Sequence, residues 1–318
     1  MIDVILTLLG LPGIGRGSVR DFLKLASNKK DSLYDLDEVI NDIMRQNTRI
    51  KLPTNTELGA VKDSVTRIRE TCLALNITIL TPVDLSYPAR FLSMSDYPVI
   101  LFAKGNVQCL NDEKNVAIIG TRKPSEPGRE MAHKLGKWFA KNDYIVTSGL
   151  ALGCDSEAHR GCLIAGGKTV AILANGLDTV SPKSNEELAE EIISAEGCLL
   201  SEYAPGEKAI RGHFVERDRL QSALSQGVIV VESGIDSGSM HAVNAGIKQG
   251  RRIACVRFSG NSIAHQEGNL TLINEGKAVG IASKEDLDRF KDSLTHAGKA
   301  MGISTLKSQQ DSQISLFD

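Results

Sequence analysis

Short apolar runs that alternate with amphipathic stretches between residues 116 and 256 are the feature that most constrains the fold of this 318-residue chain. The apolar runs cover residues 116–120, 144–148, 169–173, 198–201, 228–232 and 253–256. Helical periodicity separates most of them, at 128–141, 155–165, 185–194, 217–224 and 239–249. Such alternation is typical of a parallel sheet covered by helices on both faces. The sequence therefore predicts an α/β domain whose ligands bind beyond the carboxyl ends of the strands.

The segments on either side of this region have other patterns. Residues 1–76 show helical periodicity around the turn "LPGIGRGS" and predict a small all-helical domain. Residues 77–104 contain three prolines and predict an irregular connection with two short strands. The chain turns polar after residue 283, which predicts one helix near 284–294 and a flexible tail from about Gly298. We therefore expect three parts: residues 1–76, 77–283 and 284–318.

Three of the predicted strand ends carry glycines together with hydroxyls or an arginine. They are Gly120-Thr121-Arg122, then Ser148-Gly149 with Gly153, and finally Ser237-Gly238-Ser239. Glycine lets the backbone approach a phosphate, and the amides at a helix start carry a partial positive charge. Each loop alone could be an ordinary strand–helix turn. Three such loops on one sheet edge favour an anion-binding site.

A basic cluster lies in "RGHFVERDRLQSALS", with Arg211, His213, Arg217 and Arg219. Residues two apart on a helix do not share a face. A helix that begins near Asp218 would leave Arg217 in the preceding loop, pointing towards the strand ends. The alternative is a solvated surface on which Glu216 and Asp218 pair with the arginines.

Composition narrows the function classes. The net charge of −2 gives no overall attraction to nucleic acid, so such binding must come from a local cluster of Lys and Arg. The six cysteines are scattered, and the group Cys154, His159 and Cys162 lacks a fourth metal ligand. We expect buried reduced thiols, no metal and no cofactor. No apolar run is long enough to cross a membrane, and no signal peptide is recognised, so we expect a cytoplasmic protein.

Four stretches resemble the DNA-processing protein A family (DprA, also called Smf): "SGLALGCDSEAHRGCLIAGGKTVAILANGLD", "LLSEYAPG", "HFVERDRLQSALS" and "SGSMHAVNAGIKQGR". The resemblance extends over about residues 5–285. It implies an extended Rossmann-like parallel sheet at 77–283, preceded by a small helical domain of the helix-hairpin-helix or SAM-like type. It also implies a recombination mediator that binds single-stranded DNA in a positively charged pocket, helps load the RecA recombinase, acts as a homodimer and has no catalytic activity.

The resemblance also assigns the site. The family's Gly-Ser/Thr-Arg motif falls on Gly120-Thr121-Arg122, which makes Arg122 the leading phosphate contact. The full predicted DNA-binding set is Gly120, Thr121, Arg122, Ser148, Gly149, Gly153, Arg217, Arg219, Ser237, Gly238 and Ser239. The chain departs from the family in having Asp218 where Arg-Asn-Arg is usual, and it has no room for the C-terminal winged-helix module. It resembles a divergent member, and transformation, recombination and defence against foreign DNA all stay open as its pathway.

An alternative of another class is a nucleotide-binding sensor or a nucleotide hydrolase related to the phosphoribohydrolases. Those enzymes place a catalytic glutamate after a glycine-rich turn, whereas the corresponding stretch here, "SGSMHAVNAG", has no carboxylate. Glu202 and Glu232 are the nearest candidates for a general acid or base. The turn "LPGIGRGS" is either a structural turn or an auxiliary contact to DNA or protein.

The end of the chain carries a separate signal. Gln313, Leu316 and Phe317 in "QISLFD" resemble the peptide by which bacterial replication and repair proteins bind the sliding clamp. In such a peptide the two apolar side chains enter a pocket and the glutamine forms hydrogen bonds at its rim. The sliding clamp is therefore a further expected partner. The alternatives are a chance apolar terminus or one that packs back on its own domain.

Overall fold

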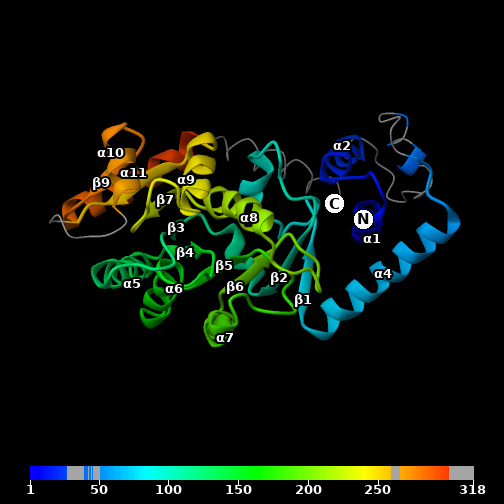
Figure 1. Cartoon of the computed structure of the whole chain (residues 1–318), viewed down its shortest axis with the longest axis horizontal. Helices are drawn as coiled ribbons and strands as arrows, with labels where there is room; N and C mark the ends of the chain where they lie inside the picture. The colour runs from blue at the N-terminus through cyan, green and yellow to red at the C-terminus, as the bar shows by residue number, and fades with distance from the viewer. Residues whose placement is uncertain (27–38, 42, 44, 46–50, 259–265, 301–318) are drawn as a thin grey trace, which may run out of the picture.

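The protein contains a nine-stranded sheet flanked by helices, with a group of helices beyond one end (Figure 1). The computed structural model describes residues 1–26, 39–41, 43, 45, 51–258 and 266–300. The strands are β1 (Ile77–Leu80), β2 (Leu101–Gly105), β3 (Asn115–Ile119), β4 (Ile145–Ser148), β5 (Thr169–Leu173), β6 (Cys198–Ser201), β7 (Gly227–Val230), β8 (Arg252–Val256) and β9 (Val279–Ile281). The predicted α/β class with an extended Rossmann-like sheet is confirmed.

In the strand order β1-β2-β6-β5-β4-β3-β7-β8-β9, the chain reverses its direction across the sheet after β3 and again after β6. From β3 the chain adds β4, β5 and β6 on one side, and it then returns to place β7 in parallel on the other side of β3. The carboxyl ends of β3 and β7 are therefore a topological switch point, where open α/β sheets bind ligands. Strands β1 and β2 extend the other edge as antiparallel partners next to β6.

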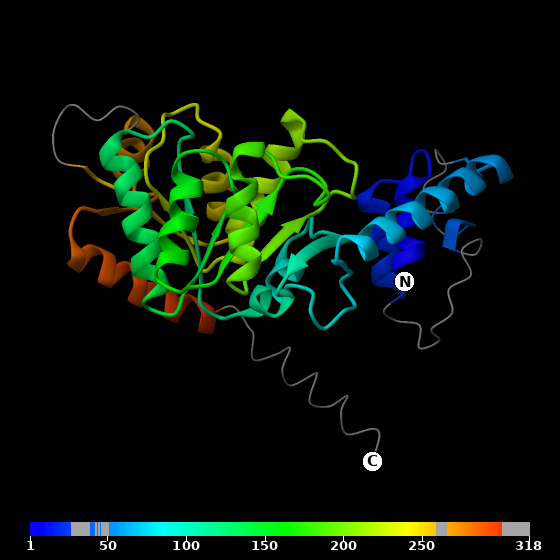
Figure 2. The same cartoon turned by 90° about the horizontal axis from the view of Figure 1, so that it is seen from below.

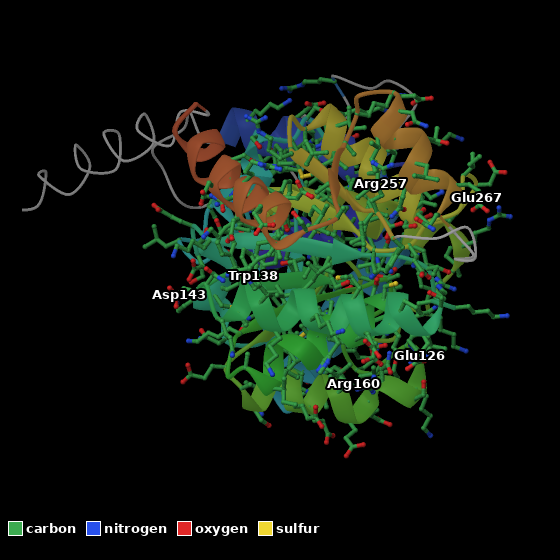
Figure 3. All side chains as sticks on the ribbon, turned by 90° about the vertical axis from the view of Figure 1, so that its left-hand side faces the viewer. Glu126, Trp138, Asp143, Arg160, Arg257 and Glu267 are labelled. Atoms are coloured by element: carbon green, nitrogen blue, oxygen red, sulfur yellow. The ribbon has the colours of Figure 1, made fainter. Side chains whose placement is uncertain are left out.

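The helices that follow the strands cover both faces of the sheet. They are α5 (Glu126–Ala140), α6 (Cys154–Ile164), α7 (Glu186–Ser194), α8 (Arg211–Leu224), α9 (Ser239–Lys248), α10 (Glu267–Asn274) and α11 (Lys284–Ala300). Side chains of a strand point alternately to the two faces. In β3, Val116 and Ile118 pack with α5, α6 and α11, whereas Ala117 and Ile119 pack with α9 and α10. Figure 3 shows the sheet between these helical layers, with charged residues such as Glu126 and Arg160 at the periphery.

The N-terminal helices share a hydrophobic core with the edge of the sheet. They are α1 (Ile2–Gly10), α2 (Arg16–Ala26) and α4 (Asn55–Ala74). Helix α4 begins with a capping box between Thr54 and Glu57, which satisfies amides that the first turn leaves unpaired. Ile5 and Leu8 of α1 belong to the same buried cluster as Phe102 of β2. The helices lie at the β1 end of the sheet, as Figure 2 shows from a second side.

Two predicted helix boundaries were wrong. Helix α8 begins at Arg211 and not near Asp218, so Arg217 lies within the helix rather than in a loop before it. Helix α11 continues to Ala300, past the point where we expected the tail to begin. Part of the predicted helical domain at 1–76 lies outside the described residues, at 27–38, 42, 44 and 46–50. The clamp-motif residues Gln313, Leu316 and Phe317 lie outside them as well.

The remaining predictions concern thiols, metals and the membrane. All six cysteines are buried and unpaired with one another, as expected. His159 is fully buried, its Nδ1 lies 2.6 Å from the hydroxyl of Thr169, and burial lowers its pKa to about 3. A search of the described residues found no cluster of acidic, His or Cys side chains that could hold a metal ion. Within the same residues, the structure contains no helix with the length and apolar character of a membrane span.

Candidate functional site

A cavity of about 740 Å³ opens at the switch point, beyond the carboxyl ends of β3 and β7. Its walls come from the loop after β3, the loop before α9, and one side of α8 from Arg211 to Gln221. Ala151 of the loop after β4 and Asp155 of α6 also contribute. The loops after β3 and β7 are tied together because the amide of Thr121 donates to the carbonyl of Glu232 at 2.8 Å. The cavity therefore lies where the sequence predicted an anion site.

Three exposed basic side chains line the cavity: Arg122, Lys123 and Arg211. Within the described residues none of the three has a carboxylate within ion-pair distance, while many other surface cations do. The guanidinium of Arg122 lies 5.0 Å from the centre of the Phe214 ring, which holds it over the cavity. These side chains can bind an anion without first breaking an ion pair.

The opposite wall consists of hydroxyls and a helix start. The hydroxyls of Ser233, Ser237 and Ser239 contact one another at 2.5 to 2.9 Å. Helix α9 begins at Ser239 and has no acidic residue in its first turn. In the described part of the chain, the amides of Gly238 and Ser239 donate no hydrogen bond to another protein group. Free amides at a helix start, with hydroxyls beside them, are suited to a phosphate.

Arg217 also lines the cavity, but protein groups hold its side chain. It is 4 % exposed, and its Nη1 donates to the carbonyls of Gly149 and Ile172 at 2.7 Å each. Its Nε forms an ion pair with Asp218 Oδ1 at 3.1 Å. Arg217 thus joins α8 to the carboxyl ends of β4 and β5, and it contributes positive charge from beneath the cavity surface.

The loop after β4 supports the cavity with most of its residues, and Ala151 of this loop also lines it. A side chain at Gly149 would collide with the guanidinium of Arg217, since a Cβ there would lie 1.7 Å from Nη1. Gly153 has φ +82°, and a Cβ at this position would lie 2.5 Å from the carbonyl of Thr121. The buried hydroxyl of Ser148 donates to the carbonyl of Ile118 at 2.6 Å. In this structure the two glycines allow protein groups to approach closely, where we had expected a ligand.

Two buried carboxylates accompany the basic groups of the cavity. Asp155 is 6 % exposed and accepts a hydrogen bond from the amide of Gly149 at 3.0 Å. Asp218 is 9 % exposed, and its Oδ1 receives a hydrogen bond from Gln221. Burial raises the pKa of Asp155. Burial also raises the pKa of Asp218 to about 6, although Arg217 opposes this shift. The cavity therefore contains acidic groups whose ionisation is costly.

The start of helix α5 is occupied by the protein's own carboxylate. Glu232 is fully buried, and its side chain accepts hydrogen bonds from the amide of Ser125 at 2.9 Å and from the Ser125 hydroxyl. Gly128 has no space for a side chain beside this carboxylate. In dinucleotide-binding sheets the helix after the first strand presents its free amides to the pyrophosphate. Here an internal anion already fills that position.

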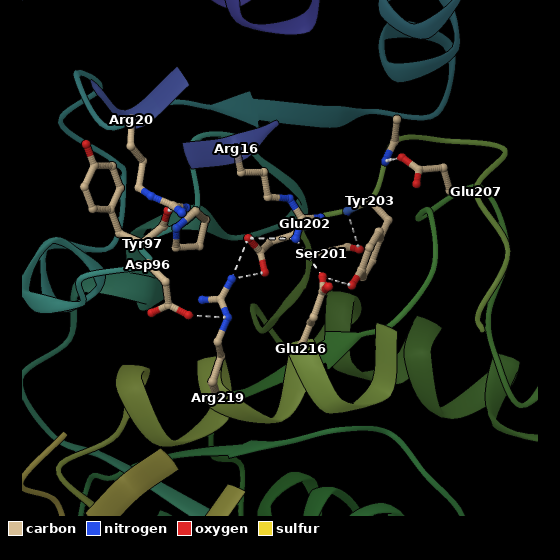
Figure 4. A network of polar contacts seen from close by, with 12 residues as sticks. Arg16, Arg20, Asp96, Tyr97, Ser201, Glu202, Tyr203, Glu207, Glu216 and Arg219 are labelled. Atoms are coloured by element: carbon tan, nitrogen blue, oxygen red, sulfur yellow. Dashed lines mark hydrogen bonds and ion pairs between the residues drawn. The ribbon is translucent and has the colours of Figure 1, made fainter. Parts of the chain in front are cut away.

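Arg219 lies on another side of α8, in a network of charged residues shown in Figure 4. It makes two hydrogen bonds to Glu202, at 2.7 and 2.9 Å, and an ion pair with Asp96 at 3.2 Å. Glu202 is almost completely buried, and burial raises its pKa, an effect that Arg219 and Arg16 oppose. Arg219 is not among the residues that line the cavity.

The turn "LPGIGRGS" contributes to the same network. Arg16, at the start of α2, donates to Glu216 of α8 at 2.7 Å and lies 5.4 Å from the centre of the Tyr203 ring. Arg20 donates to the carbonyl of Tyr97 at 3.2 Å. These contacts attach the N-terminal helices to α8 and to the edge of the sheet (Figure 4). They support the structural interpretation of the turn.

The cavity thus brings together only part of the predicted site. Lining it are Gly120, Thr121, Arg122, Arg217, Ser237, Gly238 and Ser239, while Ser148, Gly149, Gly153 and Arg219 lie outside its lining. The predicted DNA-binding set left out other lining residues, namely Lys123, Phe214, Asp155, Asp236, His241 and Arg211, although Arg211 was part of the predicted basic cluster. Lys123 could have been found because it follows the Gly-Thr-Arg motif directly. Asp236 could have been found because it adjoins Ser237.

Comparisons with known proteins identify relatives of the chain and of its fold. DNA processing protein DprA from Streptococcus pneumoniae is 35% identical over 212 residues, which cover 66% of this chain and 73% of that protein. The X-ray structure of DprA from that species covers 90% of this chain and 96% of its own, with a TM-score of 0.75 and 28% identity. DNA processing protein A from Helicobacter pylori, whose structure concerns its single-stranded DNA binding mode, has a TM-score of 0.61 and 30% identity. It covers 70% of this chain and 97% of its own.

The family model for DNA recombination-mediator protein A matches residues 78–291. This match begins in β1 and ends within α11, so it contains every strand described above and all the walls of the cavity. Together with the S. pneumoniae relative, it shows that the chain belongs to the DNA recombination-mediator protein A family.

Proposed function

We propose that the cavity binds the sugar–phosphate backbone of single-stranded DNA and that the protein acts as a recombination mediator. The observation that carries this proposal is the position of Arg122, an exposed arginine that forms no ion pair with any described residue. It lies at the switch point, opposite the amides of Gly238 and Ser239, which donate no hydrogen bond to the same part of the chain. The binding of single-stranded DNA by the H. pylori relative supports it.

Both walls of the cavity would contact the phosphates of the bound strand. Arg122, Lys123 and Arg211 supply charge, and the start of α9 supplies hydrogen-bond donors. Arg217 would act from below by keeping α8 and the strand ends in place. Each phosphate neutralised on a single strand contributes a slope of about −0.7 to the dependence of log affinity on log salt. Binding should therefore weaken steeply with salt.

Phe214 is the aromatic residue that we propose for contact with a base. It lines the cavity, is half-buried and lies beside Arg122. Tyr203, the other aromatic close to the basic cluster in sequence, is buried and stacks on His213 with ring centres 3.8 Å apart. Stacking on aromatic rings does not depend strongly on base identity. Binding should therefore have little sequence preference.

A nucleotide sensor or hydrolase is the second candidate, because Asp155 and Asp218 are buried carboxylates with raised pKa values in a cavity. The two glutamates considered from the sequence do not support it. Glu232 is bound to the start of α5, and Glu202 is paired with Arg219. The filled α5 start also argues against a dinucleotide. We propose that the protein binds without catalysis and without a cofactor.

A titration separates the two functions. Labelled oligonucleotides of increasing length, and free mononucleotides, are titrated against the wild type and Arg122→Ala. An affinity that increases with strand length, falls with salt and is lost in Arg122→Ala supports DNA binding. Tight binding of a mononucleotide with no dependence on length, or release of base or phosphate from it, would instead support the nucleotide function.

The proposed partners need their own tests. RecA loading is measured as the rate of filament formation on DNA coated with single-strand binding protein, and Arg122→Ala should abolish the stimulation. A homodimer should appear in light scattering as twice the mass of the chain. Deletion of the segment that contains Gln313, Leu316 and Phe317 should abolish retention on immobilised sliding clamp; unchanged retention would contradict that partner.

A further inference from the structure

The cavity is much less positive than a DNA-binding pocket would be expected to be. Its basic lining residues are Arg122, Lys123, Arg211 and Arg217, and its acidic ones are Asp155, Asp218 and Asp236. With all of these ionised and His241 neutral, the excess is a single positive charge. A phosphate that enters therefore approaches buried carboxylates as well as arginines, and the protonation of those carboxylates decides how strongly the cavity attracts it.

Asp218 is the carboxylate whose geometry matters most. Both hydrogen-bond and ion-pair contacts of its side chain, from Gln221 and Arg217, go to Oδ1. Among the described residues no donor contacts Oδ2, although the side chain lines the cavity and is 12 % exposed. Asp155, on α6, has its Oδ2 occupied by the amide of Gly149. Asp218 therefore presents a buried carboxylate oxygen, Oδ2, that lies at the cavity and is available to a ligand.

We propose that Asp218 takes up a proton when a backbone phosphate binds and then donates it, from Oδ2, in a hydrogen bond to a phosphate oxygen. This rests on the proposed DNA binding of the cavity. A carboxylate and a phosphate cannot lie side by side in a partly dry site unless a proton lies between them. The proton comes from solvent, and no covalent bond forms or breaks. The geometry thus makes Asp218 a residue that selects ligands by charge.

The charges around Asp218 agree with this role. Arg217 on its own helix and Arg122 from the loop after β3 favour its ionised form, whereas Asp155 from α6 opposes it. Lys123, Arg211, Asp236 and His241 line the same cavity at greater exposure. Burial is the largest effect and raises the pKa of Asp218 to about 6. A bound phosphate raises it further, so affinity should be highest below about pH 6 and should fall as pH rises through the higher pKa of the complex.

An ionised Asp218 acts against terminal phosphates more strongly than against internal ones. A phosphodiester carries one negative charge, whereas a terminal phosphomonoester carries nearly two at neutral pH, since its second pKa is about 6. An ionised Asp218 repels the monoester about twice as strongly as the diester. An ionised Asp218 therefore lowers the affinity for a 5′-phosphate end or a free nucleotide more than it lowers the affinity for the interior of a DNA strand.

The wild-type protein provides the first test. Calorimetric titration with a 5′-hydroxyl oligothymidylate near pH 7, in buffers of different ionisation enthalpy, should show uptake of up to one proton per bound site. Uptake should vanish near pH 5, where Asp218 is already protonated. Binding without proton uptake near pH 7 would overturn the proposal, while absence of any binding would instead overturn the proposed function.

Variants identify the group. Asp218→Asn should bind the oligonucleotide about tenfold more tightly than the wild type near pH 8, lose the proton uptake, and gain more affinity for thymidine 5′-monophosphate than for the oligonucleotide. Asp236→Asn is the matched control, because Asp236 lines the same cavity but is exposed; its effect should stay below about threefold. His241→Gln should retain the proton uptake. Uptake that persists in Asp218→Asn but disappears in His241→Gln would assign the proton to the histidine and contradict the proposal.

Discussion

Helix α8 contributes to two charged clusters that contain the same kinds of side chain but differ in whether their arginines form ion pairs. On the cavity side, Arg122 is exposed and forms no ion pair among the described residues. On the side of the N-terminal helices, Arg219 is held by Glu202 and Asp96, and Arg16 by Glu216 (Figure 4). An arginine such as Arg122 in the first cluster is available to bind a ligand. Those in the second cluster maintain the contact between the N-terminal helices and α8. The presence of an arginine in a motif therefore does not establish that it is available to DNA.

Arg217 lies between the two cases, and its removal should have the largest effect on stability. Arg217→Met would leave the carbonyls of Gly149 and Ile172 without a donor, and Asp218 without its ion pair. Breaking a buried charge pair typically costs about 3–5 kcal/mol. Urea unfolding should show a loss of this order, against less than about 0.5 kcal/mol for Arg122→Met on the exposed side. Equal stabilities of the two variants would contradict the distinction.

A substitution of Arg219 in the second cluster should lower the free energy of unfolding by less. A second substitution, of Glu202, should restore part of that loss. In Arg219→Met, the one cation within ion-pair distance of the buried Glu202 among the described residues is Arg16, at 3.9 Å. Because Arg219 is partly exposed, we expect a loss of about 2 kcal/mol in the free energy of unfolding. The double variant Arg219→Met with Glu202→Gln should recover at least half of this loss, since it removes the uncompensated charge. Failure of the second change to recover stability would show that the pair does not carry the contact.

For DNA affinity the order of the effects should be the reverse of that for stability: a substitution of Arg122 should weaken binding more than one of Arg219. Arg122→Ala should weaken binding of an oligonucleotide about tenfold or more, equivalent to about 1.4 kcal/mol, and reduce the salt slope by about one phosphate contact. Arg219→Gln should change affinity by less than about twofold, provided that it remains folded at the assay temperature. A larger effect at Arg219 than at Arg122 would place the DNA on the other side of α8.

The sequence predicted the frame of this site well, because local patterns determine it. The apolar runs are confirmed as β3 to β8, and strand topology brings Gly120–Arg122 and Ser237–Ser239 to one edge. Helix α8 was placed too late because its start has no side-chain cap: the preceding residue is Ile210. Two short strands were expected in the 77–104 connection, but their antiparallel pairing beside β6 has no local signal.

The sequence could not predict which arginines are bound by other protein groups, because the partners of these arginines lie at a distance in the sequence. Arg217 donates to carbonyls 68 and 45 residues away, and Arg219 pairs with Glu202 from β6's end, 17 residues before it. The alternative of a solvated surface was wrong for Arg217 and Asp218, which do pair but are buried. Glu216 pairs with Arg16 of α2 and not with an arginine of the predicted cluster. Only the three-dimensional structure distinguishes a paired cation from an unpaired one at this spacing.

The smallest expected effect is the pH dependence of stability, which tests the carboxylate on the cavity side of α8. The folded-state pKa of Asp218 is raised to about 6 from an ordinary value of 3.8. A raised carboxyl pKa means that the folded protein binds the proton more tightly than the unfolded chain does. The resulting stability is complete below about pH 4 and is lost as pH rises through about 6. Between pH 5 and pH 7 the wild type should therefore lose about 1 kcal/mol that Asp218→Asn does not lose. Urea unfolding of both proteins at the two pH values measures this difference, and equal slopes would show that Asp218 ionises without cost in the folded state.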